Sequence, residues 1–407
     1  MDVFSRRELP LRIAGPAAMM AAQAAQVAEA TPPSLGNLFA PIEGYGRTLS
    51  PSHSFLEPRF KDLEAWKREA RELYRARLGY WPKGGPVQAR TISRRPRNGY
   101  VQEDLEIQLS PFAAAPAVLL IPEKPLKNRP ALVALHDHGG FYYFGKEKLI
   151  ETDDEPPILT EFKRKLYSGR SFASEFARAG YVVLVIDAFY FGGRRLLPET
   201  LPAGKAKTLD ELKRGSDAYI AASNRIASAY EDLTAKTIFL SGATWPGMLT
   251  FDDVRSVDYL ATRPEVNRER IGCVGLSLGG LRAAMLCGMH PAIRSSVVCC
   301  WMSAFKPMLR NDVEHHTWML YNAAALEVMD EADVASMTAP NWLLVQYGKQ
   351  DTLFPMAGKA ESAEKLKKIF AKAKAADRFK ASFWDEPHSF PKGMQDEALE
   401  WFGRTLA

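Results

Sequence analysis

The chain has 407 residues, of which 46% are hydrophobic and 25% are charged, a composition typical of a water-soluble globular protein. Collagen-like, coiled-coil and intrinsically disordered chains are therefore excluded. The formal net charge is +5 and the basic residues form no dense block, so the charge indicates no nucleic-acid partner. The four cysteines lie between positions 273 and 300 without the paired spacing of a zinc site, which predicts small buried side chains, with neither a metal centre nor a cofactor.

Residues 1–30 resemble a twin-arginine export signal. Arg6 and Arg7 precede a weakly apolar, alanine-rich run over 13–27, and small residues follow at 28–30, where a signal would be cleaved. We therefore expect either a removable signal and a periplasmic or secreted mature protein, or a plain N-terminal arm on a cytoplasmic protein. No stretch of the sequence approaches 18 consecutive apolar residues, so we expect no membrane span.

Residues 31–86 predict an N-terminal extension that precedes the main domain. Residues 31–57 hold many Pro, Gly and Ser residues without periodicity, and we expect an extended lead-in on the surface. Residues 58–78 predict an amphipathic helix, because apolar side chains recur at spacings of three and four. The stripe that we expect to dock on the main domain comprises Leu63, Trp66, Ala70, Leu73 and Arg77.

Residues 87–407 predict one large α/β domain. The first three strands, expected over 87–93, 100–109 and 117–122, form an antiparallel meander. Nearly continuous apolar runs then alternate with helical segments, as in parallel strands that are buried on both faces. These runs lie at 131–136, 181–187, 271–275, 295–301 and 342–347, with a final strand at 379–384 and a helix at 394–406. The pattern predicts a doubly wound, mostly parallel sheet.

Two segments are longer than simple connections require. They cover about 196–239 and 306–339, both have a helix-rich pattern, and both fall where insertions above the carboxyl edge of the sheet would lie. They are either walls or lids of a pocket, or ordinary surface helices.

The strongest motif is Gly275-Leu276-Ser277-Leu278-Gly279, which follows the apolar run at 271–274 and opens a helix over 281–289. A serine on such a strand-to-helix turn is held in a cramped backbone conformation, and small flanking residues let the strand and helix approach closely. Ser277 is therefore the candidate nucleophile.

A serine nucleophile needs a base and a carboxylate that orients the base, here in the chain order Ser, Asp or Glu, His. His388 follows the last predicted strand and is the candidate base. Asp351 follows the strand that ends near Tyr347 and is the candidate acid, preferred over the alternatives Asp385 and Glu386, which lie too close to His388 in sequence. The other downstream histidines have other expected roles: His290 is expected to cap a helix, and His315 and His316 are expected at solvent-exposed or lid positions of the second insertion.

The candidate site also needs donors for the oxyanion that forms during acyl transfer. The backbone N–H of Leu278 is one candidate, because it directly follows the nucleophile. The second is expected from the loop after the strand at 131–136, where the amides of His138 and Gly139 remain alternatives. We expect the side chains of His136 and His138 to hold this loop together by hydrogen bonds.

These motifs, in this order, resemble the α/β-hydrolase superfamily, and within it the dienelactone-hydrolase-like and acetylxylan-esterase-like branch. The N-terminal helix that ends at Leu78-Gly79 and the segment at 187–195 share in the resemblance, which covers about residues 58–407. It implies the α/β-hydrolase fold and esterified, often acetylated, carbohydrate substrates. Dienelactone hydrolases proper use a cysteine nucleophile, whereas this chain has Ser277, which favours ester hydrolysis over dienelactone chemistry.

The sequence therefore predicts a metal-independent serine carboxylic ester hydrolase that works through an acyl-enzyme on a small-molecule or carbohydrate ester. A serine peptidase or an acyltransferase with the same site is the main alternative, and a hydrolase fold used only for binding is another. The sequence does not identify the acyl group, the alcohol or the oligomeric state.

Overall fold

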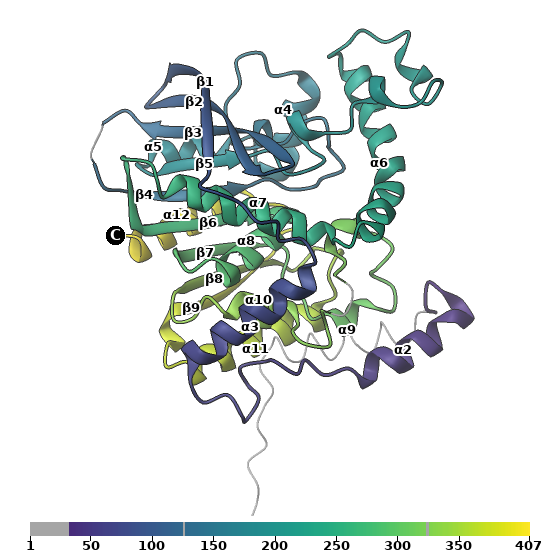
Figure 1. Cartoon of the computed structure of the whole chain (residues 1–407), viewed down its shortest axis with the longest axis vertical. Helices are drawn as coiled ribbons and strands as arrows, with labels where there is room; N and C mark the ends of the chain where they lie inside the picture. The colour runs from purple at the N-terminus through teal and green to yellow at the C-terminus, as the bar shows by residue number, and fades with distance from the viewer. Residues whose placement is uncertain (1–31, 125–126, 323–324) are drawn as a thin grey trace, which may run out of the picture.

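The computed structural model describes residues 32–124, 127–322 and 325–407, so the predicted export signal lies outside the described residues. The described residues form a nine-stranded sheet in the order β1-β2-β3-β5-β4-β6-β7-β8-β9 (Figure 1). Its strands are β1 Gln88–Arg97, β2 Tyr100–Ser110, β3 Ala113–Pro122, β4 Arg129–Leu135, β5 Val182–Ile186, β6 Val266–Leu276, β7 Ile293–Cys299, β8 Trp342–Gly348 and β9 Phe379–Trp384.

Strand directions confirm the predicted change of pattern along the chain. β1, β2 and β3 pair antiparallel, and β3 pairs antiparallel with β5. From β5 across the sheet to β9, every neighbouring pair is parallel. All five residues of β5 are buried, and the short neighbouring strands β4, β7 and β8 are buried except for one or two residues near their starts. This explains why they appear in the sequence as continuous apolar runs.

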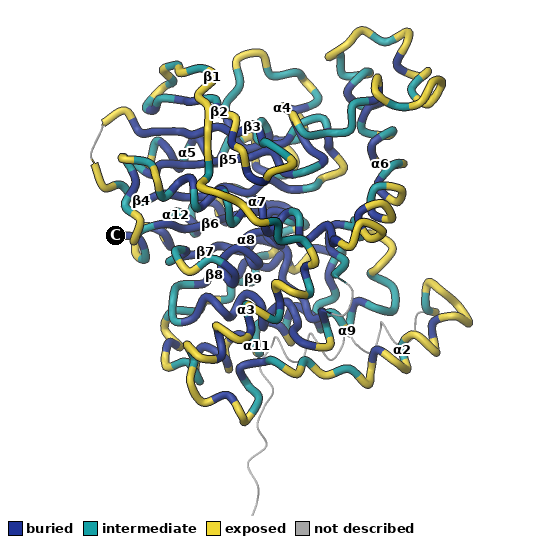
Figure 2. The backbone as a smooth tube through the Cα atoms, in the orientation of Figure 1, coloured by how far each residue is buried: buried dark blue, intermediate teal, exposed yellow. Residues whose placement is uncertain are grey.

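Helices cover both faces of the sheet (Figure 1). They are α2 Phe39–Thr48, α3 Leu63–Leu78, α4 Pro157–Tyr167, α5 Phe172–Arg178, α6 Asp217–Leu240, α7 Trp245–Leu260, α8 Leu278–Met289, α9 Phe305–Met308, α10 Glu331–Ser336, α11 Met356–Lys372 and α12 Lys392–Thr405. Strand residues alternate between the two faces: Val133 and Leu135 belong to the hydrophobic core that α3, α7 and α8 cover, whereas Leu132 and Ala134 belong to the core that α5 and α12 cover. Figure 2 shows the middle strands of the sheet as the buried centre of the molecule, whereas the edge strand β1 is largely exposed.

The predicted amphipathic helix is α3, and local chemistry fixes both of its ends. The Asp62 side chain accepts a hydrogen bond from the Ala65 amide at 2.7 Å, and Gly79 ends the helix in the left-handed conformation. The buried face differs from the expected stripe. Its centre is the line Trp66, Ala70, Tyr74 and Leu78, whereas Leu63, Leu73 and Arg77 are only partly buried along its border.

Residues 39–48 form α2, where the sequence predicted an extended lead-in. The helix contains Pro41 and two glycines, and of its apolar side chains Phe39 is buried while Ile42 and Tyr45 are largely exposed. Pro41 lies in the first turn, where a helix tolerates a missing backbone N–H group. The expectation failed because α2 has no continuous buried stripe that a periodicity could report.

The two long insertions contain less helix than predicted. In the first, residues 196–216 contain only short 3₁₀ turns, and regular helix begins with α6 at Asp217. The second is mostly irregular, with the short helices α9 and α10. In Figure 1, α6 and α9 stand beyond the right-hand end of the sheet.

Strand register brings the chemically important loops together at one edge. Leu135 of β4 pairs with Gly275 of β6, and Leu276 pairs with Cys299 of β7. Gly348 of β8 pairs with Trp384 of β9. The loops that follow β4, β6, β8 and β9 therefore leave the sheet side by side. Within the described residues, no helix is both long and apolar enough to cross a bilayer.

Candidate active site

Ser277 occupies a strained turn between β6 and α8. Its backbone has φ 57° and ψ −123°, a conformation that a residue with a Cβ rarely adopts. The turn is tight because a Cβ added to Gly275 would lie 2.3 Å from the Gly279 carbonyl oxygen, and one added to Gly279 would lie 2.0 Å from that of Leu135. The two glycines therefore let α8 start directly against β4 and β6, with Ser277 at the sheet edge.

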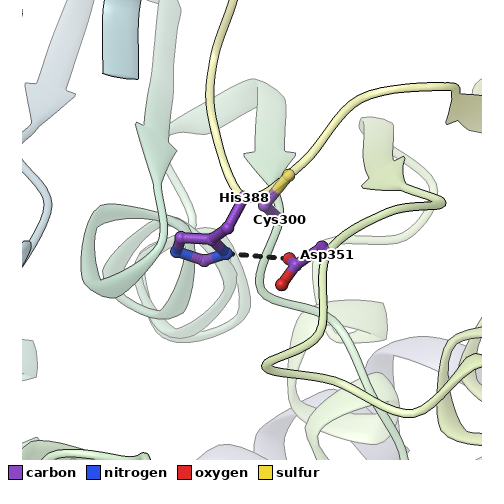
Figure 3. Close-up of side chains that lie close together, drawn as sticks. All are labelled: Cys300, Asp351 and His388. Atoms are coloured by element: carbon purple, nitrogen blue, oxygen red, sulfur yellow. Dashed lines mark hydrogen bonds and ion pairs between the residues drawn. The ribbon is translucent and has the colours of Figure 1, made fainter. Parts of the chain in front are cut away.

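His388 and Asp351 form a hydrogen-bonded pair at the same edge, on the loops after β9 and β8 (Figure 3). His388 Nδ1 lies 2.8 Å from Asp351 Oδ2, and the Asp351 side chain is fully buried. Asp351 is held in turn, because its Oδ1 accepts from the Leu353 amide at 2.9 Å. Burial alone would lower the pKa of His388, but the hydrogen bond and charge of Asp351 outweigh it and the pKa is raised. A proton at Nδ1 is thereby stabilised, which leaves Nε2 as the basic nitrogen.

Ser277 and His388 line the same two cavities. The first cavity has a volume of about 390 Å³ and is also lined by Leu278 and Gly139. The second has a volume of about 430 Å³. Among the described residues, the structure gives no hydrogen bond between the Ser277 hydroxyl and the His388 ring. The sequence-predicted nucleophile, base and acid therefore meet at one edge, with the Asp351–His388 contact made.

The alternative residues lie elsewhere or have other partners. Asp385 accepts from the Gln350 amide group at 3.1 Å. His290 caps α8 and its Nε2 lies 3.2 Å from Asp258 Oδ1. His315 and His316 line the 390 Å³ cavity, and His316 Nε2 donates to the Leu353 carbonyl at 2.9 Å. The insertion histidines thus contribute to a pocket wall.

The loop after β4 passes beside Ser277 and carries the candidate oxyanion amides. Leu278 is the first residue of α8, where backbone N–H groups have no acceptor inside the helix. His138 and Gly139 line the same cavity as Leu278. A Cβ on Gly139 would lie 2.5 Å from Asp137 Oδ2 and from the Phe162 ring, so the loop needs glycine at this position. Both amides remain alternatives.

Buried polar side chains that the sequence did not point to hold this loop. Lys148 is fully buried, and its Nζ donates to the carbonyl oxygens of Asp137 at 2.9 Å and His138 at 3.0 Å. Burial lowers the pKa of His136 well below its usual range, so the ring is neutral. Its Nδ1 donates to the Asp137 carbonyl at 2.9 Å, and its Nε2 accepts from the Ala188 amide at 3.1 Å. The expected loop-holding role of His136 is confirmed.

Glu231 of α6 is the most important residue that the sequence analysis missed. Its carboxylate accepts from His138 Nε2 at 2.6 Å, from the Tyr142 hydroxyl at 2.9 Å and from the Thr317 hydroxyl at 3.1 Å. Burial would raise the pKa of Glu231, but the hydrogen bonds and the charge of His138 lower it below the usual value. An ionised carboxylate therefore joins the loop after β4 to both insertions. A lone glutamate in a helical pattern gives no signal of such a role.

The segment after β5 supports the site through an ion pair and an aromatic contact. Arg194 donates to Asp252 Oδ2 at 2.6 Å and to the Asp187 carbonyl at 3.3 Å. Phe191 is fully buried and stacks on the Tyr142 ring at 5.4 Å between centroids. This segment therefore supports the loop that carries Tyr142.

Comparison with known proteins places the chain in a family. A relative from Bacillus subtilis (strain 168), described as "Putative hydrolase YtaP", is 27% identical over 337 residues, which cover 83% of this chain and 98% of the relative. The structure of a "putative acetyl xylan esterase" from Bacteroides fragilis has a TM-score of 0.64 at 18% identity and covers 84% of this chain and 81% of its own. A glucuronoyl esterase from Solibacter usitatus has a TM-score of 0.57 at 12% identity and covers 89% of this chain and 100% of its own. These likenesses confirm the predicted α/β-hydrolase fold. The model of the dienelactone hydrolase family matches residues 166–399, more than half of the sequence, and the chain belongs to this family.

Proposed function

We propose that the protein is a serine carboxylic ester hydrolase that works through an acyl-enzyme. The observation that carries the proposal is the 2.8 Å hydrogen bond between Asp351 and His388, beside two cavities that His388 shares with Ser277. A carboxylate-oriented imidazole next to a serine on a strained turn is the arrangement that activates a hydroxyl for nucleophilic attack.

In the first half-reaction His388 Nε2 takes the Ser277 hydroxyl proton as the serine oxygen bonds to the ester carbonyl carbon. Asp351 holds the Nδ1 proton in place and stabilises the imidazolium that forms. The negative charge on the former carbonyl oxygen is received by the Leu278 amide and by the amide of His138 or Gly139. His388 then gives the proton to the alkoxy oxygen, so that the alcohol leaves and an acyl-serine remains.

The second half-reaction repeats these steps with water. His388 Nε2 removes a proton from water, whose oxygen attacks the acyl carbon, and the same donors receive the oxyanion. Return of the proton to the Ser277 oxygen releases the carboxylic acid and restores the enzyme. One ester and one water thus give one acid and one alcohol.

We further propose that the substrate is an ester of a carbohydrate. Cavities of about 390 and 430 Å³ meet at Ser277 and His388, which provides room on both sides of the scissile bond. Hydroxyl, imidazole and carboxylate groups line the first cavity, including Ser228, Glu231 and Thr317. Such groups can hydrogen-bond a polyhydroxylated substrate. The names of the two structural neighbours, an acetyl xylan esterase and a glucuronoyl esterase, support the same substrate class.

The proposed nucleophile is tested with the variant Ser277→Ala. We expect kcat for p-nitrophenyl acetate to fall by about 10⁴- to 10⁶-fold, because the variant cannot form the acyl-enzyme. Labelling by a fluorophosphonate should be lost as well. Ser223→Ala, which removes another buried serine hydroxyl on α6, is the matched control and should retain both properties. Turnover by Ser277→Ala at the wild-type rate would falsify the proposed mechanism.

A substrate panel separates ester hydrolysis from the alternatives on the same site. Acetyl, butyryl, aromatic and uronate esters are compared with chromogenic peptide amides, and products are analysed in the presence of an alcohol acceptor. We expect acid release from esters alone. Cleavage of the amides, or formation of a new ester as the main product, would replace ester hydrolysis by a peptidase or acyltransferase activity.

A further inference from the structure

A third side chain approaches the pair formed by Asp351 and His388. Cys300 directly follows β7, is 2% exposed and has a positive φ of 47°. One ligand atom each from Cys300, Asp351 and His388 lie within 4.8 Å of one another, and Figure 3 shows the three side chains meeting from neighbouring loops. Sγ of Cys300 donates to the Ser389 carbonyl at 3.5 Å, so the thiol also contacts the loop that carries His388.

The three ligand atoms suit a borderline-soft divalent cation. Thiolate, imidazole and carboxylate are the ligands of zinc, with metal–ligand distances of about 2.0–2.3 Å, which correspond to ligand separations of roughly 3.3–3.8 Å in a tetrahedral site. The Nδ1–Oδ2 separation of 2.8 Å would need to widen slightly, while the sulfur would need to approach. The cavity of about 430 Å³ reaches His388 and Ser389 and can supply a water as fourth ligand.

We propose that Cys300, Asp351 and His388 form an inhibitory site for zinc and similar thiophilic divalent cations. The inhibitory effect rests on the proposed function, because the metal would occupy the nitrogen that normally faces the carboxylate. Hard cations such as Mg²⁺ prefer a shell of oxygen ligands and should not bind here.

The proposed binding step is balanced and explains inhibition. The metal takes the Nδ1 lone pair of His388, so the single proton of the neutral ring moves from Nδ1 to Nε2. The Cys300 thiol releases its proton to solvent and binds as thiolate, and Asp351 binds as the carboxylate that it already is. Nε2 now carries a hydrogen and has no lone pair, so His388 cannot accept the Ser277 proton.

The chain offers a matched control for this site. Cys299 is also buried, and its Sγ also faces the Ser389 carbonyl, at 3.7 Å, but it does not belong to the three-atom cluster. Cys300→Ser and Cys299→Ser thus remove neighbouring thiols of equal size, only one of which can bind the metal. Cys300→Ala is a second variant should the serine disturb folding, which a thermal melt would reveal.

The experiment titrates the full chain with Zn²⁺ in a buffer that does not chelate metals. Esterase activity is followed in parallel with metal binding, the latter by competition with a chromophoric chelator and by the absorption of Co²⁺. We expect binding of one metal per chain, inhibition that EDTA reverses, and none with Mg²⁺. Loss of the sulfur ligand in Cys300→Ser should weaken binding and inhibition by more than the roughly 10- to 100-fold that loss of an outer-shell partner costs, whereas Cys299→Ser should behave as wild type.

Failure of this proposal can be told apart from failure of the proposed function. The variant Ser277→Ala should still bind Zn²⁺ through Cys300, although it is inactive. An active esterase whose zinc affinity is the same in wild type and Cys300→Ser would refute the metal site and leave the ester hydrolase intact. Inhibition that EDTA does not reverse would show that the loss of activity does not come from reversible metal binding, and would also refute it.

Discussion

The carboxylate of Glu231 should contribute to catalysis although it lies outside the proposed set of nucleophile, base and acid. It holds His138, whose loop carries the candidate oxyanion amides, and it does so as a charged acceptor. The variant Glu231→Gln keeps the size and one carbonyl oxygen but loses the charge. This oxygen can still accept hydrogen bonds from His138 and Tyr142, and the Thr317 hydroxyl can rotate to accept one from the new amide group.

The expected magnitude follows from the difference between charged and neutral hydrogen bonds. A hydrogen bond to a charged group contributes about 1.5–3 kcal/mol and a neutral one about 0.5–1.5 kcal/mol, so loss of the charge costs about 1–2 kcal/mol. If the loop is held less firmly and the transition state is stabilised by that much less, kcat/KM falls by about 5- to 30-fold. The effect should appear in kcat, because an oxyanion donor acts mainly in the transition state.

The assay measures kcat and KM for p-nitrophenyl acetate together with thermal unfolding. Glu161→Gln is the control, since Glu161 forms an exposed pair with Arg164 on α4, and it should leave all three quantities unchanged. A Glu231→Gln variant that is less stable but has the wild-type kcat would show that Glu231 only supports the fold, and would refute its positioning role.

Three further predictions concern the acid, a buried carboxyl and the N-terminus. Asp351→Asn should lower kcat by about 10⁴-fold because the ring can adopt the wrong tautomer, whereas Asp385→Asn on the next loop should have no effect; equal rates in both would exclude Asp351 as the acid. Burial raises the pKa of Glu331 to about 8, above the usual value of 4.5, so the folded state binds a proton that the unfolded state releases. Its contribution to stability is therefore complete below about pH 4.5 and is lost as pH rises through 8, on the order of 5 kcal/mol, and melts of Glu331→Gln should show a smaller loss between these limits than the wild type. We propose export of the mature protein, whose first residue in its native host should be at or near Thr31; a cytoplasmic protein that retains Met1 would contradict this.

Local patterns explain why much of the site could be predicted. The turn around Ser277 combines a buried strand, two glycines and a helix within a dozen residues, so its chemistry is visible in sequence. Asp351 follows the apolar strand β8 and His388 follows the edge strand β9, and parallel strands bring their carboxyl ends to one edge. The fold and the Asp351–His388 contact thus follow from short-range signals and one topological rule.

The contacts that no pattern predicted are non-local or run against the usual behaviour of a residue type. Glu231 lies 93 residues from His138, and only the path of the first insertion brings the two together. Lys148 is a lysine in a polar segment, which normally indicates solvent exposure, yet it is buried and donates to two backbone carbonyls of the loop after β4. α2 was missed for a related reason, because its apolar side chains are mostly exposed.

One glutamate shared by three chain segments restricts how this enzyme can diverge. If the segment at 196–239 were replaced by that of a relative, His138, Tyr142 and Thr317 would lose their hydrogen-bond acceptor. They would keep it only if the new segment placed a carboxylate at the same position. A chimera designed to change the substrate preference should therefore exchange both long insertions and the loop at 138–142 together. Chimeras that carry only one of them are expected to lose turnover on every ester rather than acquire a new one.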